Sequence, residues 1–393
     1  MPLTAPPLAL YVHFPWCVRK CPYCDFNSYQ LRTALPEERY VAALIEDMQH
    51  QARGLSSEPL VSVFLGGGTP SLFSPAAIGR VLAAARETFG FVPDIEVTLE
   101  ANPGTIERGR FNEYRAAGVN RVSLGAQSFD PVRLEALGRI HSPAETCRAA
   151  AELHAAGISN FNLDLMYGLP DQDAQGALAD VEQAIALEPA HISHYQLTIE
   201  TGTAFAASPP RLPPEDSVAE MLGLCEERLA AAGFARYETS ALARAGRAAR
   251  HNCNYWSFGD YLGVGAGAHG KLTDPASGRI FRTVHTREPR RYLAACAGVT
   301  RKAIEPRDLP FEFMLNALRL YGGFEESLFE ARTGLRWSAV GPTLESLHSL
   351  GLMSRSASHW RPTPLGARFL NDMLMQFLPQ APSAREAALS TPI

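Results

Sequence analysis

Three cysteines stand within eight residues near the start of the chain, at Cys17, Cys21 and Cys24. Cysteines this close together beside two prolines do not form a core pattern. A structural zinc site needs four ligands and usually shows two C-x2-C pairs, whereas this chain offers only His13 as a nearby fourth ligand. Thiolates also hold iron–sulfur clusters. The triplet therefore favours a [4Fe–4S] cluster with one iron left open to a small molecule that carries an amine and a carboxylate.

The composition restricts the class of protein. The chain has 393 residues, of which 46% are hydrophobic and 20% charged, as in an ordinary globular protein of two or three domains or of one barrel with an extension. A net charge of −5 argues against nucleic acid as a partner. We find no apolar run of ~18 residues that would span a membrane, and no basic segment and cleavage site of a signal peptide. These observations predict a cytoplasmic protein.

A strand-then-helix pattern recurs over the first two hundred residues. The predicted strands are 8–14, 60–65, 95–99, 121–125, 161–166 and 191–197. Between them, helical periodicity with Gly or Pro near the ends predicts helices over 37–51, 75–89, 106–117, 143–156 and 174–187. Alternating strands and helices indicate parallel strands with right-handed crossovers. Six such units predict a partial (β/α)6 TIM-like barrel in an α/β fold.

The remainder of the chain has a different character. A helix is expected over 215–232, a strand over 234–240, and a mostly helical part over 308–378 with a short β-wing at 352–362. We therefore expect a barrel core at 1–240, a connecting region at 241–300 and a smaller helical C-terminal domain at 301–378. The segment 379–393, rich in Pro, Ala and Ser, is expected to be a disordered tail.

Polar and glycine residues follow directly after several of the predicted strands. They include the Gly-rich turn at 66–70, Glu100, Gln127 and the stretch that begins at Asp164. In β/α barrels the carboxyl ends of the strands carry the active site. These separate features, together with the cysteine triplet, are thus expected to meet at one mouth of the barrel.

The cysteine spacing on the first strand–helix loop, followed by GGGTP after the second strand, resembles the radical S-adenosylmethionine (SAM) superfamily. The stretches YVHFPWC, GGGTPS, EANPG, GAQSF, LGRIH and DLMYGLP further resemble the family of the oxygen-independent coproporphyrinogen III oxidases and the heme chaperones HemW. The resemblance covers nearly the whole chain. It implies that Cys17, Cys21 and Cys24 hold the cluster. It also implies that SAM bound to the cluster contacts Tyr11, Gly67 and Glu100, and that a second SAM contacts Gly68, Thr69, Gln127, Arg139 and Asp164.

Two departures from the oxidase pattern favour the chaperone branch of this family. Phe26 stands where the oxidases have a fourth cysteine, and only sixteen residues precede Cys17, whereas the oxidases have a longer N-terminal segment. The motif HNxxYW, from His251 to Trp256, is associated with heme binding in the chaperones. A neutral imidazole is a common axial ligand of heme iron, so His251 is the predicted heme ligand. The alternative is that His251 and Trp256 are packing residues, and the roles of Cys253 and His269 stay open.

The resemblance implies a heme chaperone that binds heme, a [4Fe–4S] cluster and SAM. It implies delivery of heme to acceptor proteins, among them respiratory enzymes met transiently at the membrane. The alternatives are an oxygen-independent coproporphyrinogen III oxidase, a radical SAM enzyme that performs an oxidative decarboxylation, and a zinc-stabilised binding module. The sequence leaves open which protein accepts the heme, whether heme is held covalently, whether SAM is cleaved, and the oligomeric state.

Overall fold

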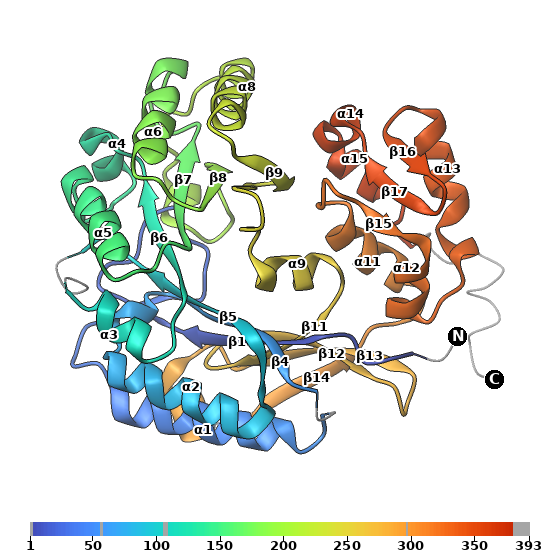
Figure 1. Ribbon diagram of the computed structural model, residues 1–393, viewed down its shortest axis with the longest axis horizontal. Coiled ribbons are helices and arrows are strands. Elements are labelled where there is room, and N and C mark those ends of the chain that lie inside the picture. The colour runs from blue at the N-terminus through green and yellow to red at the C-terminus, as the bar shows by residue number, and fades with distance from the viewer. Residues whose placement is uncertain (1–2, 56–57, 105–108, 296–297, 380–393) are drawn as a thin grey trace.

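All six strand-length runs form strands of one sheet in the computed structural model, which describes residues 3–55, 58–104, 109–295 and 298–379 (Figure 1). Each strand pairs in parallel with the next one along the chain. The partial (β/α)6 barrel is therefore confirmed. Its strands are β1 (Leu8–Phe14), β4 (Leu60–Gly67), β5 (Phe91–Ala101), β6 (Arg121–Gln127), β7 (Phe161–Tyr167) and β8 (His191–Gln196).

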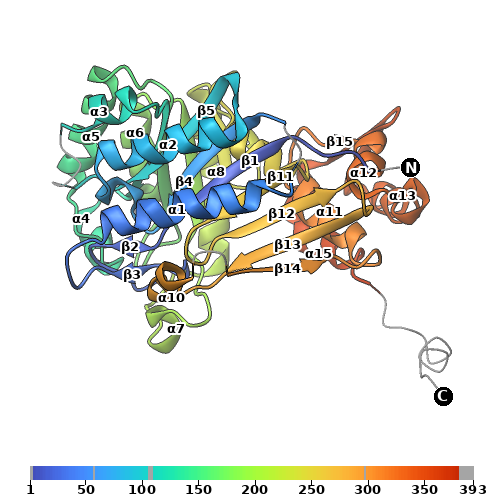
Figure 2. The ribbon, with the colours of Figure 1, turned by 90° about the horizontal axis from the view of Figure 1, so that it is seen from below.

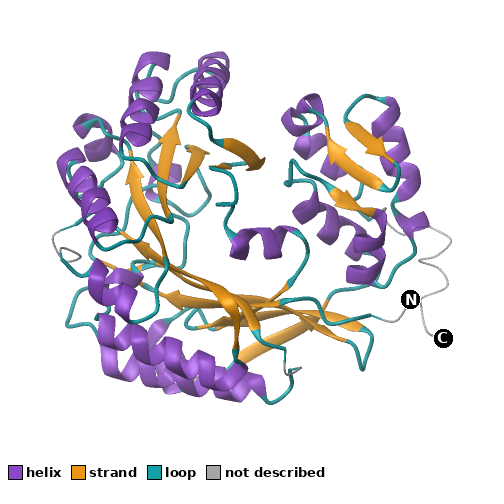
Figure 3. Cartoon of the chain, in the orientation of Figure 1, coloured by secondary structure: helices purple, strands orange, loops and turns teal. Residues whose placement is uncertain are grey.

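The five predicted helices cover the outer face of this sheet (Figure 3). Their bounds are α1 (Glu37–Ala52), α2 (Pro75–Phe89), α3 (Phe111–Ala116), α5 (Pro143–Ala155) and α6 (Ala174–Ala186). A further short helix, α4 (Pro131–Ala136), follows β6 and was not predicted. The predicted start of α3 at residue 106 lies outside the described residues, and the helix begins at Phe111.

Local signals explain why α2 was predicted to the residue. Ser74 caps its first turn, since the Ser74 hydroxyl accepts a hydrogen bond from the Ala77 amide at 3.2 Å. Pro75 occupies the first helical position, where its fixed φ fits and its missing N–H is not needed. Gly90 ends the helix at φ +72°, a left-handed conformation that favours glycine.

The strands of the barrel differ between their two faces. The side chains that face the helices are apolar and almost fully buried: Leu10, Val12, Val63, Leu65, Val97, Leu99, Val122, Leu124, Leu163 and Leu165. The alternating positions, which we call the inner face, are largely polar: Tyr11, His13, Ser62, Glu96, Thr98, Glu100, Arg121, Ser123, Asn162, Asp164, His191 and Ser193. The helix-facing residues form the main core, so the polar residues are left for binding or chemistry.

The sheet continues past both edges of the barrel to twelve strands within the described residues. On one side β11 (Asp260–Val264) pairs in parallel with β1, and an antiparallel set follows, made of β12 (His269–Asp274), β13 (Arg279–His285) and β14 (Val299–Ala303) (Figure 2). On the other side α8 (Glu215–Ala231) leads to β9 (Ala235–Glu238) and β10 (Ala241–Ala243). The domain boundary expected at residue 240 stays a prediction. The sheet itself continues beyond that residue, as far as Ala303 in β14.

The C-terminal part is a smaller, mostly helical domain with its own core, as expected. Its elements are α11 (Leu309–Ala317), β15 (Phe324–Glu325), α12 (Glu326–Thr333), α13 (Gly341–Ser349), β16 (Met353–Ser356), β17 (His359–Pro362), α14 (Pro364–Arg368) and α15 (Leu370–Met375). The predicted β-wing corresponds to β16 and β17, and Trp360 of β17 is fully buried. Nearly all of the predicted tail, from residue 380 onward, lies outside the described residues. None of the helices in the described ranges has the length and apolarity that a bilayer crossing needs.

A buried ion pair joins the extended sheet to the C-terminal core. The Lys271 ammonium lies 2.6 Å from a carboxylate oxygen of Asp260, and both side chains are almost fully buried. The same ammonium sits 4.4 Å from the centre of the Phe258 ring, which packs against Phe313 of the C-terminal core. Asp260 also accepts hydrogen bonds from the amide and hydroxyl of Thr273. Both of its carboxylate oxygens are thus hydrogen-bonded.

We expect Asp260→Ala to lower the free energy of unfolding by about 3–5 kcal/mol, because it leaves a buried ammonium without its counter-charge. Chemical denaturation measures this change. The control is Glu38→Ala, which removes an exposed ion pair with Arg80 and should cost less than about 1 kcal/mol. A loss of similar size in both variants would contradict the importance of the buried pair.

Candidate functional site

The cysteine loop connects β1 to α1 and is held at both ends. Its first and last parts, β2 (Trp16–Cys17) and β3 (Tyr29–Gln30), form a short parallel pair. In the middle, the Lys20 ammonium donates to the carbonyl oxygens of Phe26 and Ser28 at 3.1 and 3.0 Å. The loop therefore closes on itself, and its three thiols stay on one side of it.

His13 and Asn27 anchor this loop to the barrel. His13 Nε2 donates to the Asn27 carbonyl at 2.9 Å, so Nδ1 carries no proton and accepts from the Tyr11 hydroxyl at 2.8 Å. Burial lowers the pKa of His13 to about 4, which keeps the ring neutral near pH 7. The Asn27 amide donates to the carbonyl oxygens of Ala266 and Arg287, both at 2.9 Å. The loop is thereby tied to the segments that follow β11 and β13.

One cavity at the carboxyl ends of the strands brings most of the predicted site residues together. Its lining includes all three cysteines of the triplet, and we call it the cysteine cavity. The other predicted site residues that line it are Gly67, Gly68, Thr69, Glu100, Gln127, Arg139 and Asp164. Tyr11 lies on the same inner face but does not line the cavity, and His251 lies elsewhere.

The cysteines fit a cluster in their arrangement and chemistry. All described cysteines are free thiols. Burial raises the pKa of Cys17 and Cys24, so a metal that binds there must displace their protons. Within the described residues, no three His, Cys, Asp or Glu side chains are grouped in the manner of a single-ion site. A [4Fe–4S] cluster does not need such a group, because each of its cysteines binds a different iron.

The glycine turn after β4 approaches the cysteine loop too closely for any side chain. The Gly68 amide donates to the Phe14 carbonyl at 2.7 Å, and a Cβ on Gly68 would lie 2.6 Å from the Trp16 carbonyl oxygen. Gly67 has φ +114°, and a Cβ there would collide with the His13 ring. Glycine is therefore required at both positions, and the turn presents bare backbone to the cavity.

Two carboxylates face each other across the cavity floor. Glu100 Oε2 accepts the Gly67 amide at 2.9 Å, while Asp164 accepts from Ser123 at 3.1 Å and from Asn162 at 2.8 Å. Burial, and to a lesser extent the negative charge of Asp164, raise the pKa of Glu100 to about 7, against the opposing effect of the hydrogen bond from the Gly67 amide. Such a pair favours a ligand with hydroxyl or cationic groups.

Arg139 forms the opposite wall of the cavity. Its guanidinium donates to Asn102 Oδ1 at 2.5 Å and to the Gly125 carbonyl at 3.0 Å, and it lies 3.7 Å from the Cys21 sulfur. Asn102 in turn donates to the Thr69 hydroxyl at 2.9 Å. We did not predict a role for Asn102, although it lies in the EANPG stretch and is the side chain that joins Arg139 to Thr69.

Gln127 is conformationally strained. It has φ +61°, a region that non-glycine residues seldom adopt, and it sits at a register shift between β6 and β7. Its side-chain oxygen is buried and has no hydrogen-bond partner within the described structure. Strain and an unpaired buried acceptor in a cavity wall are features of binding sites.

The HNxxYW motif forms a short helix, α9 (Arg250–Trp256), at the other end of the inner face. The His251 ring is buried, its Nδ1 lies 3.1 Å from the Ser62 hydroxyl, and it packs 5.1 Å from the Phe64 ring. Burial and the nearby Arg121 lower the pKa of His251 to about 3. Ser62 lies five residues before Gly67 along β4, or ~16 Å at 3.3 Å per residue. The motif is therefore well separated from the cysteine cavity.

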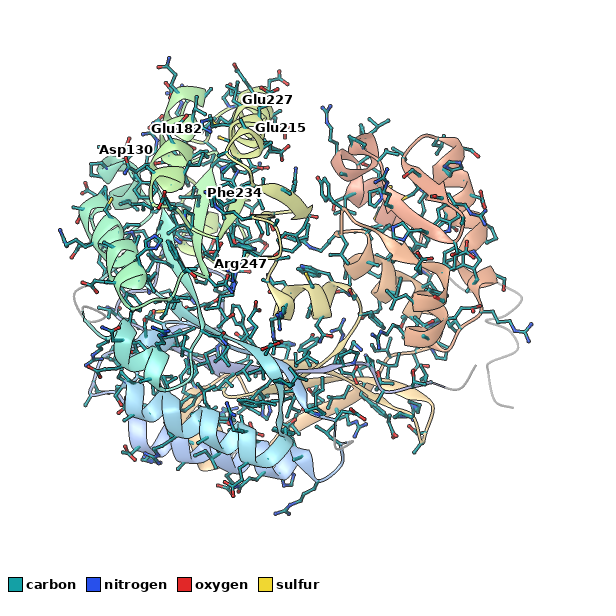
Figure 4. All side chains as sticks on the ribbon, in the orientation of Figure 1. Asp130, Glu182, Glu215, Glu227, Phe234 and Arg247 are labelled. Carbon is teal, nitrogen blue, oxygen red and sulfur yellow. The ribbon has the colours of Figure 1, made fainter. Side chains whose placement is uncertain are left out.

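Basic residues surround the start of α9. Arg247, labelled in Figure 4 on the segment that leads into the helix, lines a second cavity with Arg250. Glu96 also lines it and accepts the His251 amide at 3.2 Å. Trp256 lies 4.3 Å under the Arg319 guanidinium, and its ring N–H has no partner within the described residues. His269 is exposed, and burial raises the pKa of the Cys253 thiol to about 11.

Comparison with protein families gives two matches. A model of the radical SAM superfamily matches residues 11–184, and a model of the HemN C-terminal domain matches residues 304–369. The heme chaperone HemW of Escherichia coli K12 is 46% identical over 95% of this chain and 98% of its own length. HemW of Haemophilus influenzae is 45% identical with the same coverage. A mitochondrial radical SAM domain-containing protein of Mus musculus is 35% identical over 98% of this chain and 90% of its own length.

The solved structure of coproporphyrinogen III oxidase (HemN) from Escherichia coli has the same fold. Its TM-score is 0.80 over 95% of this chain and 90% of that chain. The two sequences are 22% identical, so this likeness concerns the fold alone.

The raised pKa of Glu100 leads to a test of its environment. A carboxyl whose folded pKa of about 7 exceeds its ordinary value of 4.5 makes the folded state less stable as the pH rises through that interval. We expect Glu100→Gln to change the free energy of unfolding more favourably at pH 8 than at pH 5, by roughly 2–3 kcal/mol. Urea denaturation of both proteins at each pH measures this difference. Glu113→Gln, an exposed change on α3, should show no such difference. An equal effect of Glu100→Gln at both pH values would contradict this prediction.

Proposed function

Because the chain belongs to the family of the heme chaperone HemW, within the radical SAM superfamily, we propose that it binds heme and delivers it to acceptor proteins. The observation that carries this proposal is the 46% identity over nearly the full length of a HemW, together with the cysteine cavity. The proposal includes a [4Fe–4S] cluster and SAM as cofactors. It also places the protein in the cytoplasm, with membrane respiratory enzymes among the acceptors that it meets transiently.

We propose Cys17, Cys21 and Cys24 as the cluster ligands. When bound, a cluster with three thiolate ligands offers a fourth iron to which the amine and carboxylate of SAM can attach. The Arg139 guanidinium lies 3.7 Å from the Cys21 sulfur, so a positive charge stands beside that ligand. His13 and Asn27 hold the loop in place, and both side chains stay neutral when the cysteine ligands lose their protons.

The residues proposed for SAM form two sets, and the glycine turn contributes to both. Tyr11, Gly67 and Glu100 are proposed to contact SAM on the cluster. Glu100 offers a carboxylate to hydroxyl groups, and the glycine backbone admits a ligand closely. Gly68, Thr69, Gln127, Arg139 and Asp164 are proposed to contact a second SAM. The unpaired oxygen of Gln127 is the acceptor that such a ligand would satisfy.

The heme site is proposed at α9, with His251 as the iron ligand. Since Nδ1 of His251 lies within hydrogen-bonding distance of Ser62, ligation has to use Nε2. Arg247 and Arg250 are placed to pair with propionates, and Tyr255 and Trp256 offer ring faces. The ring of His251 is buried, so heme binding at this residue requires a local movement of α9.

The cluster assignment predicts that Ala at any of Cys17, Cys21 or Cys24 abolishes the iron–sulfur absorption of the reconstituted protein. The reason is that each thiolate holds one iron. Cys147→Ala, which alters a cysteine outside the cavity, is the matched control and should retain four irons per chain. Iron and sulfide analysis with visible spectroscopy measures both. A full cluster in the Cys21→Ala variant would rule out this ligand set.

The heme assignment predicts that His251→Ala loses the Soret band of a His-ligated heme but keeps the iron–sulfur spectrum. Ser62→Ala is the matched control. It removes the partner of Nδ1 and leaves Nε2 in place, so heme should still bind with a His-type spectrum. Heme titration and thermal melting of both variants separate ligation from packing. If His251→Ala lowers the melting temperature yet binds one heme with an unaltered spectrum, His251 is a packing residue.

A further inference from the structure

A line of hydrogen bonds crosses the inner face from the cysteine cavity to the start of α9. Asp164 Oδ1 accepts from the Asn162 amide at 2.8 Å, and Asn162 Oδ1 lies 2.6 Å from His191 Nδ1. His191 Nε2 lies 2.8 Å from the Tyr237 hydroxyl, which accepts the backbone amide of Ala249 at 3.2 Å. Ala249 immediately precedes α9. Four contacts therefore join a carboxylate of the cavity to the HNxxYW helix.

The chemistry of the partners fixes the direction of each bond. An ionised Asp164 can only accept, so Asn162 must turn its NH2 group toward it and its oxygen toward His191. That oxygen can only accept, so His191 must carry its proton on Nδ1. His191 Nε2 is then an acceptor and receives the Tyr237 hydroxyl proton. Every donor in the line thus points from Ala249 toward Asp164.

Burial protects the line from water. Asn162 and His191 are each 1% exposed, so solvent cannot replace a lost partner. Burial and the charge of Arg121 lower the pKa of His191 well below its usual range, so the ring is neutral. Burial raises the pKa of Asp164. The other groups around Asp164 are Glu100 on β5, Arg121 and Ser123 on β6, and Ser193 and Tyr195 on β8.

We propose that Asn162, His191 and Tyr237 are positioning residues that transmit the ionisation state of Asp164 to the start of α9. When Asp164 gains a proton it becomes a donor, and the Asn162 amide turns over to accept it. The hydroxyls of Ser123 and Ser193, which contact the Asn162 amide at 2.7 and 3.1 Å, rotate with it: Ser123 then donates to the Asn162 oxygen, and Ser193 accepts from its NH2 group. Asn162 then offers NH2 to His191 Nδ1. The ring responds by releasing its Nδ1 proton and taking one at Nε2, in an exchange with water that needs a transient local opening. Asp164 carries the only net added proton, and His191 stays neutral.

The change reaches α9 through the Tyr237 oxygen. In the ionised state of Asp164 that oxygen accepts only the Ala249 amide. In the protonated state the Tyr237 hydroxyl proton turns away from the ring, and the oxygen accepts from His191 Nε2–H as well. The amide then shares its acceptor and is held less firmly. A cationic ligand such as the sulfonium of SAM beside Asp164 favours the ionised state and hence the firmly held amide. The effect of SAM on Asp164 rests on the proposed function. The link between Asp164 and the tautomer of His191 does not depend on it.

The experiment follows the tautomer of His191 by 15N NMR of the full chain labelled at its histidine rings. The His191 signals are identified by their loss in His191→Gln. At pH 8 we expect a protonated Nδ1 and an unprotonated Nε2. As the pH falls, the Nε2–H form should increase, because Asp164 becomes protonated. Asp164→Asn should remove this pH dependence, while Asp180→Asn, which alters a buried carboxyl bonded to Ser128, should keep it.

Hydrogen exchange of the Ala249 amide gives a second measurement. Tyr237→Phe removes the acceptor, so this amide should exchange at least about tenfold faster, a loss of roughly 1.4 kcal/mol of protection. An Nε2–H form at pH 8, or a pH dependence that survives in Asp164→Asn, would overturn the proposal. If the tautomer depends on Asp164 but added SAM does not favour the Nδ1–H form, the link holds and the assignment of SAM to Asp164 fails.

Discussion

The polar groups on the inner face of the sheet have to be paired, and much of the molecule is arranged to meet that requirement. A buried charge or amide without a partner costs more than a hydrogen bond returns. Glu100 therefore takes the amide of Gly67, and Arg139 takes Asn102 and the Gly125 carbonyl. The pairing is nearly complete around the cysteine cavity, where Gln127 Oε1 and Arg139 Nε are buried without a partner among the described residues. Unpaired atoms in a wall that is mostly satisfied mark the place where a ligand contributes.

The same requirement explains the position of the two motifs. The cysteine loop and the glycine turn lie at the carboxyl ends of the parallel strands, where backbone groups leave the sheet and become available. The HNxxYW helix lies toward the other end and supplies partners for Ser62 and Glu96. His251 thus serves the barrel as a packing and hydrogen-bonding residue in the structure described, whatever it binds in addition.

Sequence patterns were informative where the signal is local. The start of β1 and both ends of α2 were predicted correctly, because a buried apolar run and a Ser–Pro start with a glycine end are short-range features. The clustering of Glu100, Gln127 and Asp164 followed from parallel topology. The pairing of β11 with β1 was missed, because nothing near residue 260 specifies a partner near residue 8. Asn162, His191 and Tyr237 were missed for the same reason. For Asn162 and His191 the signal was a polar residue on a buried strand, whereas Tyr237 lies on the short, partly exposed strand β9.

The anchors of the cysteine loop have a consequence for the order in which the protein is made. Asn27 is tied to Ala266 and Arg287, and β1 completes its pairing only with Asp260–Val264. Contacts between residues so far apart in sequence form late, because the chain between them must first be ordered. On the ribosome, Cys17, Cys21 and Cys24 emerge early, but their loop can be fixed only after most of the chain has been synthesised. Metal loading that depends on a fixed loop is therefore a late event, which follows synthesis of the barrel instead of nucleating it.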